Sequence, residues 1–142
     1  MISTKGRYAV RVMIDLAQHS DGDAYTPLKD IAARQEISKK YLEIIIRDLV
    51  AGGLVSGVSG KKGGYRLSRA PEAYTIGEIL ELTERSIAAV ACLEGGEQIC
   101  PRSDTCPTLP MWTELNALVH DYFYSKKLSD LVNQGTNQGT VL

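Results

Sequence analysis

The stretch that decides the fold is ISKKYLEIIIRDLVAGGLVSGVSGKKGGYRLSR, residues 37–69. Its first half places apolar residues every three or four positions, which is the spacing of one face of an α-helix. Ser38 is suited to cap this helix, and Gly52 and Gly53 are suited to end it, so the pattern predicts a helix over residues 39–51. The second half sets two short apolar runs, LVSGV and YRLSR, around the glycine-rich SGKKGG, and this predicts a β-hairpin.

Two helices are predicted before this stretch. GRYAVRVMIDLAQHS has apolar residues at helical spacing, which predicts a helix from Tyr8 to His19. TPLKDIAARQE then offers Thr26 as a cap and Pro27 at the first helical position, so a second short helix follows. Two short helices joined by a tight turn form a helix-turn-helix, and the hairpin directly after them completes the winged-helix arrangement.

The residues after the hairpin predict two further helices with a cysteine-containing loop between them. YTIGEILELTER begins with a capping box, in which Thr75 and Glu78 each bond to the other's backbone. A long amphipathic helix is expected over residues 108–124, and SDLV adds a short helical turn. The apolar stripe of this helix is wide, so we expect the stripe to pack against a partner subunit. Packing of the stripe on the first helix remains the alternative. Its apolar residues are Met111, Trp112, Leu115, Leu118, Val119, Tyr122 and Phe123.

The predicted fold class is therefore mainly α with a small β-hairpin wing: a winged helix-turn-helix plus a long C-terminal dimerisation helix. Residues 1–85 form the DNA-binding domain, and residues 86–107 form a cysteine-containing sensor loop. Residues 108–133 hold the dimerisation helix and the short terminal helix. Residues 134–142 are polar and glycine-containing, which predicts a flexible tail.

Composition restricts the kinds of function. The chain has 142 residues, 44% of them hydrophobic, which suits a small globular protein. No run approaches the length that spans a membrane, and the N-terminus lacks a signal-peptide pattern, so we expect a cytoplasmic protein. The net charge is −1. It divides into +5 over residues 1–69 and −6 over residues 70–142, and such asymmetry favours contact of the first half with a polyanion.

The candidate DNA contacts lie in three places. The second helix of a helix-turn-helix presents its N-terminal residues to base edges, where lysines serve phosphates or guanine and a glutamate accepts from cytosine. The wing tip combines glycines, which allow close approach to a phosphate, with two lysines suited to the minor groove. Two cations begin the first helix. The predicted set is Lys5, Arg7, Ser38, Lys39, Lys40, Tyr41, Glu43, Ser59, Lys61, Lys62, Gly63, Gly64 and Tyr65.

All the cysteines fall in the loop, as Cys92, Cys100 and Cys106. Cytosolic thiols stay reduced, so clustered cysteines favour metal or redox chemistry. The spacing C-x7-C-x5-C lacks the close pair typical of zinc sites. Three thiolates on one loop can converge on a metal cluster with one position left open, and three thiols without metal remain the alternative.

Four motifs resemble the Rrf-two (Rrf2) family of bacterial transcription regulators, whose members include IscR-like, NsrR-like and CymR-like proteins. They are STKGRYAV, ISKKYLE, GKKGGYRLS, and YTIGEIL before a three-cysteine loop. The resemblance covers about residues 1–133 and is closest to the IscR-like members. It implies a DNA-binding homodimer. It also implies a 2Fe-2S or 4Fe-4S iron–sulfur cluster held by Cys92, Cys100 and Cys106.

The sequence departs from this family at the fourth cluster ligand. IscR-like members have a histidine where this chain has Leu109, and NsrR-like members have an acidic residue about where Arg7 stands. His120 is predicted to lie roughly 18 Å along the helix from Thr108, too far within one subunit. Glu94, Glu97, Asp104, a residue of the partner subunit and a small external ligand remain. A cluster held by only three protein ligands would be more labile, which suits a sensor and favours its loss during purification.

We therefore predict a homodimeric transcription regulator on a pseudo-palindromic double-stranded DNA operator, controlled by its cluster. One rival is a cluster-free regulator in which two cysteines form a switchable disulfide. Another acts mainly through a protein partner that docks on the acidic C-terminal half. No nucleophile or acid–base set is visible, and His19 and His120 stand outside any catalytic motif, so no enzyme is predicted.

Overall fold

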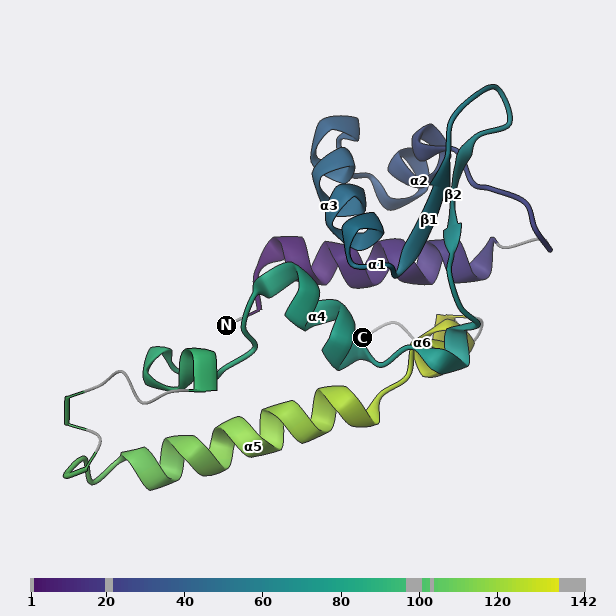
Figure 1. Ribbon diagram of the computed structural model, residues 1–142. Coiled ribbons are helices and arrows are strands. Elements are labelled where there is room, and N and C mark those ends of the chain that lie inside the picture. Colours follow the sequence, from purple (N-terminus) through teal and green to yellow (C-terminus); the bar gives the residue numbers. More distant parts are fainter. Residues whose placement is uncertain (1, 20–21, 97–100, 103, 136–142) are drawn as a thin grey trace.

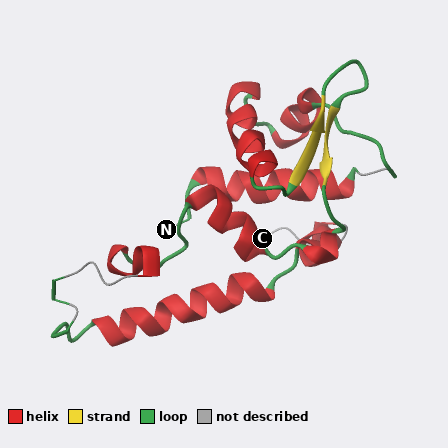
Figure 2. Cartoon of the chain, in the orientation of Figure 1, coloured by secondary structure: helices red, strands yellow, loops and turns green. Residues whose placement is uncertain are grey.

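The computed structural model describes residues 2–19, 22–96, 101–102 and 104–135. Helices α1 (Thr4–Gln18), α2 (Leu28–Gln35) and α3 (Lys39–Ala51) precede the strands β1 (Val55–Val58) and β2 (Gly64–Leu67). The 3-10 helix η1 (Pro71–Ala73) leads into α4 (Ile76–Glu84). A second 3-10 helix, η2 (Ala91–Gly96), precedes α5 (Leu109–Ser125) and α6 (Leu128–Gly135). The described chain is mainly helical with one hairpin, as predicted (Figure 2).

Helix α1 begins four residues before the predicted start at Tyr8. Ser3 caps it, because the Ser3 hydroxyl accepts a hydrogen bond from the Gly6 amide at 3.2 Å. The Glu84 carboxylate at the end of α4 accepts from the Ser3 amide at 3.0 Å and from the Ser3 hydroxyl at 2.6 Å. This contact joins residues 81 positions apart, so local sequence signals do not reveal it.

The predicted cap of α2 is wrong. Pro27, in an extended conformation, occupies the cap position and makes no side-chain capping bond. Thr26 instead forms a β-bridge with Tyr65, in which each amide donates to the other's carbonyl at 2.8 Å. Thr26, two residues before α2, therefore pairs with the hairpin rather than capping the helix.

The hairpin is antiparallel, with Val55 opposite Leu67 and Val58 opposite Gly64. Buried Tyr74 anchors its base. The Tyr74 hydroxyl donates to the Leu54 carbonyl at 2.6 Å and accepts from the amides of Ser68 and Arg69 at 2.9 and 3.0 Å. Burial raises the pKa of this phenol, although the amides that donate to it act in the opposite direction. Three backbone groups at the hairpin base are thereby satisfied by one side chain.

Helix α4 starts with the predicted capping box between Thr75 and Glu78. After α5 the chain returns to this point: the Ile76 amide donates to the Lys126 carbonyl at 2.8 Å, and the Leu128 amide donates to the Tyr74 carbonyl at 3.1 Å. Helix α6 is longer than the predicted turn and includes residues 134 and 135, which the sequence analysis places in the tail. The rest of the predicted tail, residues 136–142, lies outside the described residues.

One hydrophobic core joins α1, α2, α3, α4, α6 and the hairpin base. Figure 1 shows α1 between the α2–α3–hairpin layer and α4, while α5 runs along the far side of α4. None of the seventeen residues of α5 is buried. Core residues with no exposed surface are Ala9, Val12, Met13, Ile31, Leu42, Ile45, Leu49, Tyr74, Ile79 and Leu128.

Candidate nucleic-acid interface and cysteine loop

Helix α3 presents the predicted base-contacting residues at its first turn. The Ser38 hydroxyl caps the helix by accepting from the Tyr41 amide at 3.2 Å. Lys39, Lys40 and Glu43 are exposed. Tyr41 is half-buried, because its ring packs against Tyr8 of α1 with 5.9 Å between the ring centroids. The helix start is therefore fixed by a cap and a ring contact while its charged side chains face solvent.

The wing tip is shaped by glycines. Gly64 has φ +151°, and a Cβ there would lie 2.3 Å from the Thr26 carbonyl oxygen, so the bridge to Thr26 needs a glycine at this position. A Cβ on Gly63 would meet the Val58 carbonyl at the same distance. Ser59, Lys61 and Lys62 are exposed around this turn, and Tyr65 is half-buried. The tip thus offers two lysines on a tightly held backbone.

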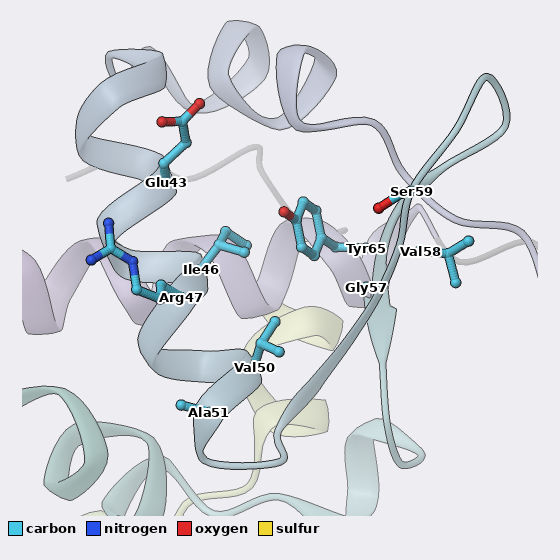
Figure 3. A pocket seen from close by; sticks show the side chains of 9 residues that line it. All are labelled: Glu43, Ile46, Arg47, Val50, Ala51, Gly57, Val58, Ser59 and Tyr65. Carbon is cyan, nitrogen blue, oxygen red and sulfur yellow. The ribbon is translucent and has the colours of Figure 1, made fainter.

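A groove of about 570 Å³ separates α3 from the hairpin. Figure 3 shows Tyr65 projecting across it from β2 toward α3. Glu43, Ser59 and Tyr65 of the predicted set line it, together with apolar Val50 and Val58. Arg47 also lines the groove and was missed by the sequence analysis. It stands four residues after Glu43, so helical spacing could have placed it on the same face.

The cations at the start of α1 differ in availability. Lys5 is half-buried in an ion pair with Asp48 of α3, which makes it a link between the two helices. Arg7 is exposed, and its Nη2 donates to the Thr4 hydroxyl at 3.2 Å. The structure therefore leaves Arg7 facing solvent, while the Lys5 charge already has a partner.

Five cations of α3 and the wing tip make no ion pair within the part of the chain that the structure describes. They are Lys39, Lys40, Arg47, Lys61 and Lys62. By contrast, Arg34, Arg66 and Arg69 pair with Asp15, Asp23 and Glu78. Five uncompensated positive charges on the surface formed by α3 and the wing favour a polyanionic ligand.

The cysteine segment begins where α4 ends, at Arg85 with φ +66°. Cys92 lies on η2, and Cys106 lies just before α5; both are free and half-buried. The Cys106 sulfur is 3.2 Å from the Thr108 hydroxyl. The pKa of the Cys106 thiol is lowered, first by this hydrogen bond and then by backbone amides. Cys100 lies outside the described residues, and within the described ranges no three metal-ligating side chains come together.

The fourth-ligand positions are distributed over the loop and α5. Leu109 starts α5, and Glu94 and Asp104 are exposed, whereas Glu97 lies outside the described residues. His120 lines a pocket of about 350 Å³ together with Leu93, the neighbour of Cys92. The first half of the segment thus returns to the middle of α5. The helical distance between Thr108 and His120 therefore does not measure how near His120 lies to the first half of the cysteine segment.

Helix α5 divides its apolar stripe between two faces. Met111, Leu115, Leu118 and Tyr122 form one exposed row, with 53, 41, 63 and 59% of their surface accessible. Phe123 and Tyr124 pack against the core, and the Tyr124 hydroxyl donates to Glu81 of α4 at 2.6 Å. Burial, and then this bond, raise the pKa of Tyr124 to about 12. The alternative in which α1 covers the stripe is wrong, since α5 packs mainly against α4.

Comparisons with known proteins match this architecture. The model of the family Rrf2, iron-dependent transcriptional regulator, matches residues 2–134. The HTH-type transcriptional regulator IscR of Erwinia tasmaniensis is 37% identical over 132 residues, which cover 93% of this chain and 78% of that protein. T. potens IscR has a TM-score of 0.76 and 32% identity, covering 100% of this chain and 93% of that one. The oxidized form of Staphylococcus aureus CymR has a TM-score of 0.72 and 33% identity, covering 93% and 95%.

No helix in the described ranges combines the length and apolar content that a bilayer span requires. The relatives are named as transcription regulators, which confirms the prediction that the chain is a regulator and not an enzyme. The resemblance carried by the four sequence motifs is likewise confirmed by the match over residues 2–134. The chain belongs to the Rrf2 family of transcriptional regulators.

Proposed function

We propose that this regulator is a homodimer that binds a pseudo-palindromic operator in the cytoplasm and that an iron–sulfur cluster on its three cysteines controls operator affinity. The observation that carries the proposal is the position of the cysteine segment. It joins Arg85, at the end of a helix packed on α1, to Thr108, at the start of α5. A change in the bonding of the thiolates therefore acts between the DNA-binding elements and the helix with the exposed apolar row.

The DNA surface is proposed to comprise the first turn of α3, the wing tip, and Arg7 and Arg47. In this arrangement α3 enters the major groove, and Lys61 and Lys62 reach the minor groove or its flanking phosphates. Glu43 repels phosphate and accepts from a cytosine amino group, so its contribution is to sequence preference. Lys5 contributes by holding α3 through Asp48.

Salt dependence tests the phosphate contacts. Lys61→Ala should reduce the slope of log affinity against log salt by about 0.9 for each phosphate that the lysine neutralises. The matched control is Lys127→Ala, an exposed lysine beyond α5 that carries the same charge. Equal slopes for Lys61→Ala and the wild type, or equal reductions for both variants, would exclude the wing from the interface.

The donor set suits an iron–sulfur cluster. Thiolates are the usual ligands of such clusters, and the lowered pKa of Cys106 favours the form that binds iron. Cys92, Cys100 and Cys106 would hold it, and it would supply a site whose assembly and loss depend on iron supply and oxidants. The two described cysteines lie at opposite ends of the segment, so holding both in one site would fix the segment between α4 and α5.

Anaerobic purification from iron-replete cells tests this assignment. The wild-type protein should contain iron and sulfide and absorb in the visible range, and each Cys→Ser variant should lose most of both. Thr105→Ala, an exposed non-ligand of the same segment, should load like the wild type. Iron-free wild-type protein, or full loading of the triple Cys→Ser variant, would contradict the cluster. Separate Glu94→Gln, Asp104→Asn and His120→Ala variants test the fourth ligand by the same readout.

A thiol switch is the second candidate, and two observations favour it. Cys106 has a lowered pKa, which increases its thiolate fraction at neutral pH. A similar protein, Staphylococcus aureus CymR, has a structure in an oxidized form. Mild oxidation of metal-free protein followed by peptide mass spectrometry should then give a disulfide between two of the three cysteines. If the cysteines stay reduced after this treatment and the protein loads a cluster, the thiol switch is excluded and the cluster-controlled regulator remains.

A further inference from the structure

The side chain of Asp15 in α1 is fully buried and charged. A carboxylate in this position requires strong hydrogen-bond partners. Asp15 accepts from Arg34 through Nε at 3.0 Å and Nη2 at 2.8 Å, which is the bidentate arrangement of an arginine–carboxylate pair. It also accepts from the Gln35 side-chain amide at 2.9 Å. Both donors belong to the last turn of α2.

Arg11, one turn earlier on α1, also bonds to Gln35. Its Nε donates to the Gln35 side-chain oxygen at 3.2 Å, and its Nη2 donates to the Gln35 carbonyl. Gln35 is the last residue of α2, where helix carbonyls lack partners within the helix. Glu36, next in the chain, adopts a left-handed conformation with φ 54° and begins the turn into α3. Two polar residues of α1 thus fix the end of α2 where the chain turns.

The same face of α1 continues to the start of α3. The Arg11 guanidinium lies over the Tyr8 ring at 4.9 Å from its centroid, and the Tyr8 ring contacts Tyr41. Tyr41 belongs to the turn that carries the proposed base contacts. Tyr8, Arg11 and Asp15 are spaced by three and four residues, so they form one stripe along α1. We call these three residues the α1 stripe.

We propose that the α1 stripe sets the orientation of α3 and thereby determines how strongly the protein prefers its operator over other DNA. The stripe residues are occupied by contacts within the chain, so they act as positioning residues. Replacing a buried ion pair by well-packed apolar residues is often neutral for stability, so a role of this pair in the arrangement of the helices is the premise of the proposal. The proposal rests on DNA binding alone and is independent of the cluster.

The experiment begins by selecting an operator from a random-sequence duplex pool with the wild-type protein. Affinities for this operator and for mixed-sequence DNA are then measured at several salt concentrations, well below the melting temperature. Asp15→Asn keeps the shape and removes the charge. It should reduce operator affinity about ten- to a hundredfold, since one misaligned base contact already changes discrimination by about fivefold or more. Affinity for mixed-sequence DNA and its salt slope should stay near the wild-type values, because the phosphate-binding lysines remain.

A second variant removes the ring contact without touching a buried charge. Tyr8→Leu should reduce the ratio of operator to mixed-sequence affinity, whereas Tyr8→Phe keeps the ring and should leave the ratio unchanged. Leu128→Val, in α6 away from α2 and α3, is the control for lost stability. The proposal is overturned if Tyr8→Leu and Tyr8→Phe have the same ratio as the wild type. It is also overturned if folded Asp15→Asn weakens both kinds of DNA equally, or if Leu128→Val lowers the ratio as much as Asp15→Asn does.

Discussion

Helices α3 and α5 are both amphipathic, yet their apolar faces have different surroundings. In α3, Leu42, Ile45 and Leu49 have no exposed surface. In α5, Met111 and Leu118 keep 53 and 63% of theirs, although the helix is longer. The apolar side of α3 is covered by its own chain, whereas the row on α5 is exposed in the part of the chain that the structure describes. The comparison teaches that amphipathicity alone does not tell which surface an apolar face meets.

The largest expected effect is at Leu49. Leu49→Ala should lower the free energy of unfolding by about 2–5 kcal/mol, because it leaves a cavity among packed side chains. Urea denaturation monitored by circular dichroism measures this change. Leu118→Ala, made on the exposed row, removes the same atoms, and in dilute protein it should change stability by only about 0.5 kcal/mol. Similar losses for both variants would remove the distinction between the two helices.

The next effect concerns assembly. Met111, Leu115, Leu118 and Tyr122 fall within one narrow arc of α5, and a second copy of this row is the proposed cover. Leu115→Glu combined with Leu118→Glu should convert dimers to monomers in analytical ultracentrifugation and weaken operator binding. Thr113→Glu places the charge on the opposite side of α5 and should leave the dimer intact. A double variant that still sediments as a dimer would place the interface elsewhere.

Local sequence signals predicted the elements that depend on neighbouring residues. Ser38 and the Thr75–Glu78 box cap their helices as expected, because caps act within one turn. Thr26 had the same local signal, but its backbone pairs with Tyr65, 39 positions away, and this long-range pairing decides its conformation. The Ser3 cap was missed for a similar reason, since Glu84 completes it.

The candidate DNA-contacting residues likewise divide into those that local sequence predicts and those that depend on contacts between distant parts of the chain. Exposed cations at a helix start or a glycine-rich tip are visible in the sequence, and the structure leaves Lys39, Lys40, Lys61 and Lys62 without an ion pair in its described part. Lys5 has an equivalent local context, but Asp48 neutralises it from another helix. The positions of Arg11 and Asp15 against α2 depend on how helices cross, and no spacing rule within one helix predicts that.

A moderate effect is expected at Glu84, which ties the helix before the cysteine segment to the start of α1. Glu84→Ala should cost about 0.5–2 kcal/mol of stability, because it removes both bonds that Ser3 donates. Thermal unfolding measures the loss. Glu72→Ala, an exposed glutamate of η1, is the control and should have little effect. An unchanged melting temperature for Glu84→Ala would show that this contact does not join the two parts of the molecule.

The smallest effect concerns the pH dependence of Cys106 in metal-free protein. The lowered pKa means that its thiolate is present at lower pH than for an ordinary cysteine, so its rate of alkylation by iodoacetamide should begin to rise at lower pH. Thr108→Val removes the hydroxyl donor and should shift the rate profile to higher pH. Peptide mass spectrometry follows Cys106 separately from the other cysteines. Superimposable profiles for the variant and the wild type would contradict the role of Thr108.

The bridge between Thr26 and Tyr65 also has a consequence for the proposed entry of the wing into a DNA groove. A two-stranded ribbon that extends into solvent loses conformational entropy when it enters a groove. Here Thr26, in the segment before α2, adds two backbone hydrogen bonds to β2, so part of that freedom is already lost in the unbound protein. Less ordering is then required on association, as in any preorganised binding surface. If the wing contacts DNA as proposed, a residue that precedes the helix-turn-helix thus makes it a more rigid contact surface.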